Sequence, residues 1–538
     1  MKNPFSKPGH PDFLGRAIAA ISWLILLGIL IHAAGLRSAI PPVPLAEHDT
    51  WGWLGSALGW LSGLGFREVF EREWLYGAFL AGCLKWVGSF SGIVIIQQAL
   101  GLVGGALAFL TWRVWLGILK PLPVWNVVAT AVGVAVVWLN LNDTHLLNLE
   151  ISLRPEAILM PVAYAQLACI SLFSYLWWTA PRRALAVVFG AMAVPLAYAL
   201  YVLKPNWALA VPLTLLPLGL ALIDWQKRSV DIRGLLAPVA GGLLALACVW
   251  LPGKLMFEKP GQKRLVLPMT LLTIHADVIL KSLRSAPPPH LPEGTIDLLE
   301  KEFETAKTQN RYYRRLGFDP DYIMYRSQLF PWLEHQHGYT REQIASFCID
   351  SYLQAWRTHP VDMTGKIFNQ FEHFLRPDEA TFTRKRLELG KYYAHSDSLY
   401  PRTLGEEHSP AVAAAFAVWR DQTTEATAVD TRLQAPRRVH DIRRSFPQLM
   451  PWITGLFLLV LVACFCRKDW HPLLLPGLMV LVFWFAPAGN ALTVAVAHAL
   501  DNSRYRISYG GLLVFAGAAM VVFLGDVILR TVVARFRR

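Results

Sequence analysis

Residues 17–36 read AIAAISWLILLGILIHAAGL, and residues 41–54, which follow almost at once, read PPVPLAEHDTWGWL. The first stretch is apolar over about 20 residues, the length that a helix needs to cross the hydrocarbon core of a bilayer. A cleaved signal peptide is the alternative, but its apolar core has only about 7 to 15 residues, which favours a permanent membrane helix. The second stretch brings Glu47, His48 and Asp49 to the point where the chain leaves the membrane.

The composition of the whole chain supports a membrane location. Hydrophobic residues make up 54% of the 538 residues, the chain contains 21 Trp, and the mean hydropathy is +0.36. A soluble core of this size cannot hide so much apolar surface, so the sequence predicts an integral membrane protein. The net charge of +13 raises the alternative of nucleic-acid binding. No nucleic-acid motif is present, however, and basic residues of membrane proteins collect beside headgroups, so we expect no nucleic-acid partner.

Apolar runs of about 18 to 24 residues recur along the chain and predict about ten membrane-spanning helices. They lie at 15–36, 88–111, 121–140, 156–178, 184–203, 207–224, 234–252, 448–466, 470–489 and 509–530. The predicted fold class is therefore an all-α polytopic membrane protein. After the first span, residues 51–87 are aromatic and rich in glycine, which favours helices that lie flat in the membrane interface.

Basic residues in short loops set the expected orientation of the spans. Such loops alternate along the chain with more weakly basic ones. The basic loops contain Arg113, Lys120, Arg182, Arg183, Lys227, Arg228, Arg233, Arg467, Lys468 and the terminal RTVVARFRR. We expect these loops and both ends of the chain to face the cytoplasm, in the inner (plasma) membrane. The predicted outer segments are then 37–87, 141–155, the turn at Lys204, 253–447 and 490–508.

The long outer segment divides the chain into three predicted parts. Residues 1–252 form an N-terminal transmembrane module of about seven helices, and residues 448–538 form a C-terminal module of about three helices. Residues 253–447 carry dense and roughly balanced charges and include stretches at helical spacing such as REQIASFCIDSYLQAWR. We expect this middle part to be a mainly helical extracytoplasmic domain.

Carboxylates gather in the predicted outer loops. In addition to Asp49, the loop before the fourth span reads LNDTHLLNLEISLRPEAILMP and contains Asp143, Glu150, Arg154 and Glu156. Each has a simpler interpretation. Asp49 has the alternative of an ordinary loop residue, and a carboxylate at Glu156 gains from the dipole of a helix start, where Arg154 can pair with it.

Cations occupy the remaining outer loops. Lys204 lies in YVLKPNWAL, and Arg504 and Arg506 flank Tyr505 in HALDNSRYRISYGG, just before the last span. Guanidinium groups bind phosphate oxygens bidentately, so two arginines on alternate positions are typical of a phosphate clamp. Snorkelling of Lys204 and anchoring by the arginines are the simpler alternatives. Carboxylates and cations from four loops thus converge on one membrane face, which suits a lipid-linked phosphate and a hydroxyl to be activated.

The sequence resembles the GT-C superfamily of polytopic glycosyltransferases, which includes the aminoarabinose and protein O-mannosyl transferases. EHDTWGWLGSA is similar to the acidic signature of the first outer loop, LEISLRPEAILMP to the second outer loop, YVLKPN to the Lys-Pro turn and DNSRYRIS to the Arg-Tyr element. YLQAWRTHPVDMTGKIFNQFEHFLRP resembles an outer His-Pro helix. The resemblance covers most of residues 10–250 and pieces of the rest. The chain departs from the family in its EHD triplet and in segment 253–447, which is larger than in compact members.

The resemblance implies an inverting glycosyltransferase that works at the outer membrane face. Asp49 would be the general base on an acceptor hydroxyl, and His48 would share that role or hydrogen-bond Asp49. The sugar would come from a polyprenyl phosphate, and the acceptor would be an envelope lipid, polysaccharide or protein. The residues expected to hold the donor phosphate are Lys204, Lys85, Arg504 and Arg506. Those expected to orient the acceptor or help hold a divalent metal are Glu150, Glu156, Asp143 and Arg154.

Three other functions fit a chain with this topology. A transporter or lipid flippase would also have about ten spans, but its ionisable residues should lie at mid-membrane depth rather than at the outer ends. An oligosaccharide ligase would differ in taking its glycan from a diphosphate-linked lipid. A non-catalytic assembly scaffold is not favoured, because it would not need charges that converge on one face.

Overall fold

A computed structural model describes residues 13–66, 71–224, 229–257, 264–289, 291–375, 386–401, 407–429, 432–434, 436–499 and 509–536. Within these ranges, nine helical segments are long and apolar enough to cross a membrane. They are α1 (Phe13–Ser38), α4 (Phe90–Leu119), α5 (Pro123–Leu141), α7 with η1 (Glu156–Ser174, Tyr175–Thr179), α8 (Arg183–Leu203), η3 to α12 (Ile232–Phe257), α23 (Arg437–Cys466), η5 with α24 (Lys468–Leu473, Leu474–Ala497) and α26 (Gly510–Phe536). The prediction of an all-α polytopic membrane protein is confirmed.

The predicted span at 207–224 does not form one helix. It is broken into η2 (Pro205–Trp207), α9 (Ala210–Thr214) and α10 (Leu216–Leu220). Prolines at 205, 212 and 217 follow one another closely here and each removes an amide donor, whereas α7 and α8 remain helical around a single internal proline. The segment still passes along the whole bundle. Lys204 caps the end of α8, whereas Asp231, after the β1–β2 hairpin (Ile223–Asp224, Ser229–Val230), pairs with Arg183 at the start of α8 at 3.0 Å.

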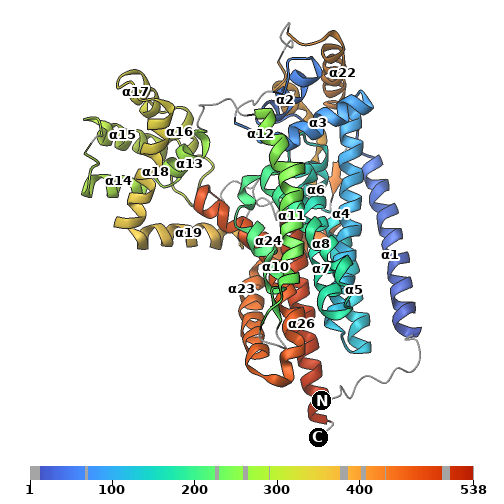
Figure 1. Cartoon of the computed structure of the whole chain (residues 1–538). Helices are drawn as coiled ribbons and strands as arrows, with labels where there is room; N and C mark the ends of the chain where they lie inside the picture. Colours follow the sequence, from blue (N-terminus) through green and yellow to red (C-terminus); the bar gives the residue numbers. More distant parts are fainter. Residues whose placement is uncertain are drawn as a thin grey trace.

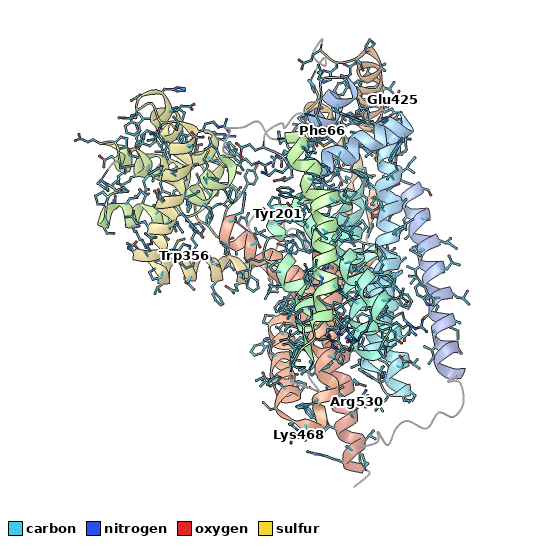
Figure 2. All side chains as sticks on the ribbon, in the orientation of Figure 1. Phe66, Tyr201, Trp356, Glu425, Lys468 and Arg530 are labelled. Carbon is cyan, nitrogen blue, oxygen red and sulfur yellow. The ribbon has the colours of Figure 1, made fainter. Side chains whose placement is uncertain are left out.

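The two ends of the bundle are distinct. Figure 1 shows the start of α1 and the end of α26 at the same end of the bundle. In Figure 2, Lys468 and Arg530 lie at this end, whereas Phe66 and Glu425 lie at the opposite end. Lys468 and Arg530, which are predicted to be cytoplasmic, therefore lie opposite Phe66 and Glu425, which are predicted to be outside. We refer to the end with Phe66 as the outer end.

Two short helices cover the outer end of the membrane helices. They are α2 (Thr50–Leu61) and α3 (Trp74–Val87), which are too short to be among the nine spans. They pack against each other at Gly77, where an added Cβ would lie 3.1 Å from the carbonyl oxygen of Trp53. The ring of Trp53 meets Tyr76 edge-on at 5.9 Å. Figure 1 shows both helices at the top of the bundle, beside the start of α4.

Residues between α12 and α23 contribute to two hydrophobic cores. The first part lies beside the bundle (Figure 1) and has a core of its own, and its Ile367 and Phe374 join the core of the bundle. We call residues 264–375 the helical domain. Its helices are α13 (Val266–Ile274), α14 (Ala276–Ser285), α15 (Thr295–Thr308), α16 (Pro320–Tyr325), α17 (Leu329–His335), α18 (Arg341–Thr358) and α19 (Pro360–Phe374). The first, α13, is apolar, whereas α14 is amphipathic, and the chain bends by 80° between them. Their buried residues, among them Leu272 and Ile279, line the core of the domain.

The second part joins the core of the membrane bundle. It consists of α21 (Leu389–Ser398), α22 (Pro410–Ala426) and the antiparallel pair β3–β4 (Arg386–Glu388, Arg432–Gln434). Trp419 of α22 stacks on Phe90 at the start of α4, with ring centroids 4.3 Å apart. Trp356, at the lower edge of the helical domain in Figure 2, packs against both cores. The predicted extracytoplasmic segment is thus divided between a lateral domain and a cap on the bundle.

Candidate functional site

The acidic stretch of the first outer loop is fixed to the loop between α6 (Thr144–Ile151) and α7. The amide of Leu45 donates to the carbonyl of Ile151 at 2.8 Å, and the amide of Leu153 donates to the carbonyl of Leu45 at 3.0 Å. The hydroxyl of Thr50 donates to the carbonyl of Leu153 at 3.1 Å. These bonds on both sides of residues 47–49 hold the predicted catalytic residues against the second outer loop.

The proline-rich part of the same stretch is anchored by the cap. Trp419 donates its indole N–H to the carbonyl of Pro44 at 3.0 Å, and Tyr393 donates its hydroxyl to the carbonyl of Val43 at 3.1 Å. The hydroxyl of Ser396 accepts from the amide of Ala46 at 2.7 Å. Backbone polar groups of this irregular stretch need partners when they are buried. Side chains of α21 and α22 supply them for the carbonyls of Val43 and Pro44 and for the amide of Ala46.

Asp49 lies directly before α2 and forms an ion pair with Arg72. Its Oδ1 is 2.5 Å from Nη2 of Arg72, and the two side chains are 23% and 34% exposed. The guanidinium of Arg72 also lies 5.1 Å from the centroid of the Trp53 ring, a favourable cation–π distance. Asp49 does not cap α2 through its side chain. Its carboxylate is therefore oriented by a cation while part of its surface is open to a substrate.

A chain of ion pairs joins the three outer loops. Arg154 contacts Glu47 through Nη1 at 2.8 Å and Glu156 through Nε at 3.3 Å. Lys204 pairs with the second carboxylate oxygen of Glu156. The pair of Arg154 with Glu156, the simpler interpretation of these residues, is therefore present. It belongs to a larger network in which two cations balance two carboxylates and in which Lys204 is held beside the start of α7.

Glu150 is fully buried and clamps α1 to α6. Arg37, at the end of α1, donates to its two carboxylate oxygens at 2.7 and 2.8 Å. Burial raises the pKa of the Glu150 carboxyl, and the charge of Arg37 opposes this rise. Gln97 of α4 donates to the backbone carbonyl of Glu150 at 2.7 Å and accepts from the hydroxyl of Tyr76 at 2.8 Å. Glu150 therefore has a structural role, holding the end of α1 to α6, and it has no exposed surface that an acceptor could contact.

Gly101 makes room for this buried carboxylate, which gives a prediction about stability. A Cβ at position 101 would lie 2.0 Å from Oε1 of Glu150, and the bidentate contact with Arg37 keeps Glu150 from moving. We expect Gly101→Ala to lower the free energy of unfolding by about 1–3 kcal/mol, the usual cost of overpacking. Gly28→Ala in α1 is the matched control, because no atom lies within 4 Å of its added Cβ. Equal stability of both variants would contradict the proposed tight fit at Gly101.

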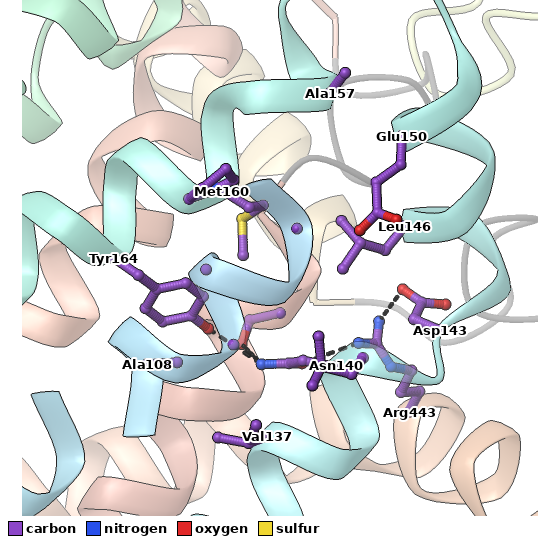
Figure 3. A pocket seen from close by; sticks show the side chains of 16 residues that line it. Ala108, Val137, Asn140, Asp143, Leu146, Glu150, Ala157, Met160, Tyr164 and Arg443 are labelled. Atoms are coloured by element: carbon purple, nitrogen blue, oxygen red, sulfur yellow. Dashed lines mark hydrogen bonds and ion pairs between the residues drawn. The ribbon is translucent and has the colours of Figure 1, made fainter. Parts of the chain in front are cut away.

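Asp143 lines a small cavity between the membrane helices, whose wall is mostly apolar and carries a few polar groups (Figure 3). Its carboxylate lies 2.6 Å from Nη1 of Arg443, which comes from the first turns of α23. Arg443 donates to Asn140 at 3.0 Å, and Asn140 donates to the hydroxyl of Tyr164 at 3.1 Å. The cavity has a volume of about 30 Å³, enough for about two water molecules. Asp143, Arg443, Asn140 and Tyr164 therefore border a cavity that is large enough for water and lies next to the predicted outer loops.

The other predicted site residues contact different partners or lie outside the described chain. Lys85 is exposed on α3 and lies 5.0 Å from the ring centroid of Trp60. His48 is exposed and faces His395 of α21, with ring centroids 5.9 Å apart. Arg504 and Arg506 lie outside the described residues. Over the described part of the chain, no three His, Cys, Asp or Glu side chains gather closely enough to hold a metal ion.

Sequence reasoning missed three cations that pair with the predicted carboxylates. They are Arg37, Arg72 and Arg443, which pair with Glu150, Asp49 and Asp143. One signal was present, because each arginine lies in or beside a predicted outer segment and a buried carboxylate requires a compensating charge. The choice among the available arginines could not be made, since the partners are 113, 23 and 300 positions apart in the chain.

Protein-family models, curated protein sequences and solved structures give no match to this chain. The resemblance of its motifs to the GT-C superfamily therefore stays a prediction. The function proposed below depends on that prediction and on the geometry of the outer loops.

Proposed function

We propose that the protein is an inverting glycosyltransferase that moves a sugar from a polyprenyl phosphate to a hydroxyl group. The acceptor is an envelope lipid, polysaccharide or protein at the outer face of the inner (plasma) membrane. The observation that carries this proposal is the environment of Asp49. A partly exposed carboxylate at the start of an interfacial helix is held by Arg72, and it lies on a loop bonded to the loop of Arg154 and Glu156.

In the proposed reaction, Asp49 takes the proton of the acceptor hydroxyl. The hydroxyl oxygen attacks the anomeric carbon and forms the new glycosidic bond. The bond from that carbon to the phosphate oxygen breaks, and its electron pair leaves with the polyprenyl phosphate. Phosphate is a good leaving group, so one base and nearby cations suffice, whereas a glycosidase needs an additional acid. Lys204 and Lys85, with Arg504 and Arg506, are the proposed phosphate-binding residues.

The location of the buried charges favours this function over transport. Transporters need ionisable groups near the middle of the bilayer. The buried ion pairs of the described membrane helices lie instead near helix ends, with Arg37 and Glu150 at the outer end and Asp526 and Arg530 of α26 at the opposite end. This arrangement supports chemistry at the surface of the membrane.

Purified protein in lipid nanodiscs tests the proposal directly. We expect release of polyprenyl phosphate from a polyprenyl-monophosphate sugar, in proportion to the acceptor that is glycosylated. A matching diphosphate-linked glycan is the comparison, because an oligosaccharide ligase would consume it. Turnover of the diphosphate donor alone, or no turnover of any donor with an envelope extract as acceptor, would contradict the proposal.

Lys204→Ala is expected to weaken the use of the donor. A charge-assisted hydrogen bond contributes about 1.5–3 kcal/mol, so the KM for the donor should rise about 10- to 100-fold. The KM for the donor should rise more than the KM for the acceptor, because Lys204 is proposed to contact the phosphate itself and is linked to the predicted acceptor residues only through its ion pair with Glu156. Lys281→Ala, which removes an exposed lysine of the helical domain, should behave as the wild type. An unchanged donor KM in Lys204→Ala would remove Lys204 from the phosphate site.

A further inference from the structure

The tripeptide Glu71-Arg72-Glu73 contacts the helical domain with its outer two residues. The carboxylate of Glu71 accepts from the backbone amides of Leu265 at 2.9 Å and Val266 at 3.0 Å, which are the first amides of α13. It also pairs with Arg341, the first residue of α18, at 2.8 Å. Glu71 therefore binds the start of two helices of this domain at once, where an acidic group is most favourable.

Glu73 makes the second contact, and Arg72 turns the other way. Glu73 forms an ion pair with Arg264, next to the start of α13. Arg72, between the two glutamates, contacts Asp49 and the Trp53 ring instead. Glu71 and Glu73 thus point to the helical domain and Arg72 to Asp49. The backbone of Glu71 has a φ of 56°, in the left-handed region, where the chain turns sharply. Residues other than glycine rarely adopt this conformation, and it persists only where surrounding contacts impose it.

The other cations near this part of the site are engaged elsewhere. Arg154 is shared between Glu47 and Glu156, and Lys85 lies over Trp60. His48, next to Asp49 in the chain, faces His395 of α21. Among the described residues, Arg72 pairs with the carboxylate of Asp49, and the residues on both sides of Arg72 are bound to the helical domain.

We infer that the helical domain positions the carboxylate of Asp49 through Glu71, Arg72 and Glu73. The two glutamates hold the tripeptide against α13 and α18, and this contact directs Arg72 toward Asp49. Arg72 in turn holds one carboxylate oxygen and so orients the group that takes the proton. The inference rests on the proposed role of Asp49 as a base. It makes the helical domain a regulator of transfer, because any displacement of the domain changes the orientation of the base.

A double-mutant cycle measures this coupling in the full-length protein in nanodiscs. We expect Glu71→Gln with Glu73→Gln to lower kcat about 10- to 100-fold, the usual cost of misplacing a catalytic group by about 1 Å. The KM for donor and acceptor should not change. Arg72→Gln should lower kcat at least as much, and Arg72→Lys should restore part of it. The triple variant should be no slower than Arg72→Gln, because residues that act through one another are not additive.

Two outcomes of the cycle would overturn the inference. In one, the glutamate variant has the wild-type kcat. In the other, the triple variant shows the product of the separate losses, so that the glutamates act independently of Arg72. Asp362→Asn with Glu304→Gln is the matched control, because it neutralises two carboxylates that form exposed ion pairs inside the helical domain. This control should keep the wild-type kcat.

A distance measurement separates failure of this inference from failure of the proposed function. Spin labels at Glu334→Cys in the helical domain and Trp86→Cys at the end of α3 report their separation without any reaction, after Cys248 and Cys466, the two exposed cysteines, are replaced by Ser. We expect one narrow distance distribution in the parent protein and a broader or shifted one with Glu71→Gln and Glu73→Gln. If both proteins have the same distribution, the glutamates do not hold the domain and the inference fails, whether or not sugar is transferred.

Discussion

Replacing Asp49 with asparagine is expected to lower the rate of sugar transfer about 10²- to 10⁴-fold, the usual contribution of a general base. The amide keeps the size of the side chain but cannot take a proton from the acceptor hydroxyl. The fold should survive, because the ion pair of Asp49 with Arg72 is partly exposed and such pairs contribute at most about 1 kcal/mol. The measurement is the initial rate at saturating donor and acceptor, with equal amounts of folded protein.

Glu425→Gln is the control for the loss of one negative charge at the outer face. Glu425 is an exposed residue of α22, at the same end of the bundle as Asp49 but on a different element (Figure 2). We expect this variant to transfer sugar at the wild-type rate. A wild-type rate for Asp49→Asn, or an equal loss in both variants, would contradict the role of Asp49 as the base.

Glu150→Gln is expected to have the largest effect on stability, a loss of about 3–5 kcal/mol in the free energy of unfolding. The substitution leaves the guanidinium of Arg37 buried without a compensating charge, since both of its contacts to a carboxylate are lost. Steric trapping of the protein in bicelles measures this free energy. Activity should fall with the folded fraction, because the ion pair holds the end of α1 against α6.

A second variant, in which an apolar pair replaces Arg37 and Glu150, shows whether Glu150→Gln loses stability through the unbalanced charge of Arg37 or through the lost contact between the two side chains. Arg37→Met combined with Glu150→Leu should recover most of the stability, because an apolar pair of similar volume often replaces a buried ion pair without cost. Asp362→Asn, which breaks an exposed pair with Lys281, should leave stability unchanged. A Glu150→Gln protein as stable as the wild type would show that Arg37 does not depend on the charge of Glu150.

The membrane helices could be predicted because each leaves its own local signal. An uninterrupted apolar run of bilayer length, as in residues 17–36, has few alternatives to a helix once it is in lipid. The exception, segment 207–224, is equally apolar, and its prolines decide how it folds. The same prolines are visible in the sequence, but α7 and α8 each contain a proline and stay helical. The signal for a broken crossing is therefore the close succession of three prolines, and not the presence of one.

The details of the candidate site depend on contacts that no local pattern contains. The sequence indicates that Asp49 and Glu156 lie in outer loops, but the backbone bonds between Leu45 and the loop at Ile151 bring those loops together. Together, α13 and α14 have the length and hydropathy of one broken membrane span, yet their buried residues form part of the core of the helical domain. Which side chains pair when they are far apart in the sequence depends on the assembled fold, and the periodicity of the sequence does not predict it.

The central claim, sugar transfer with Asp49 as the base, is tested most directly by mass spectrometry of envelope glycolipids and polysaccharides. Cells that lack the protein are compared after complementation with the wild type or with Asp49→Asn, both confirmed as folded and equally abundant. We expect one envelope component to be lighter by one sugar in the deletion strain, and only the wild type to restore its mass. Restoration of the same mass by Asp49→Asn would show that Asp49 is not the base of the transfer.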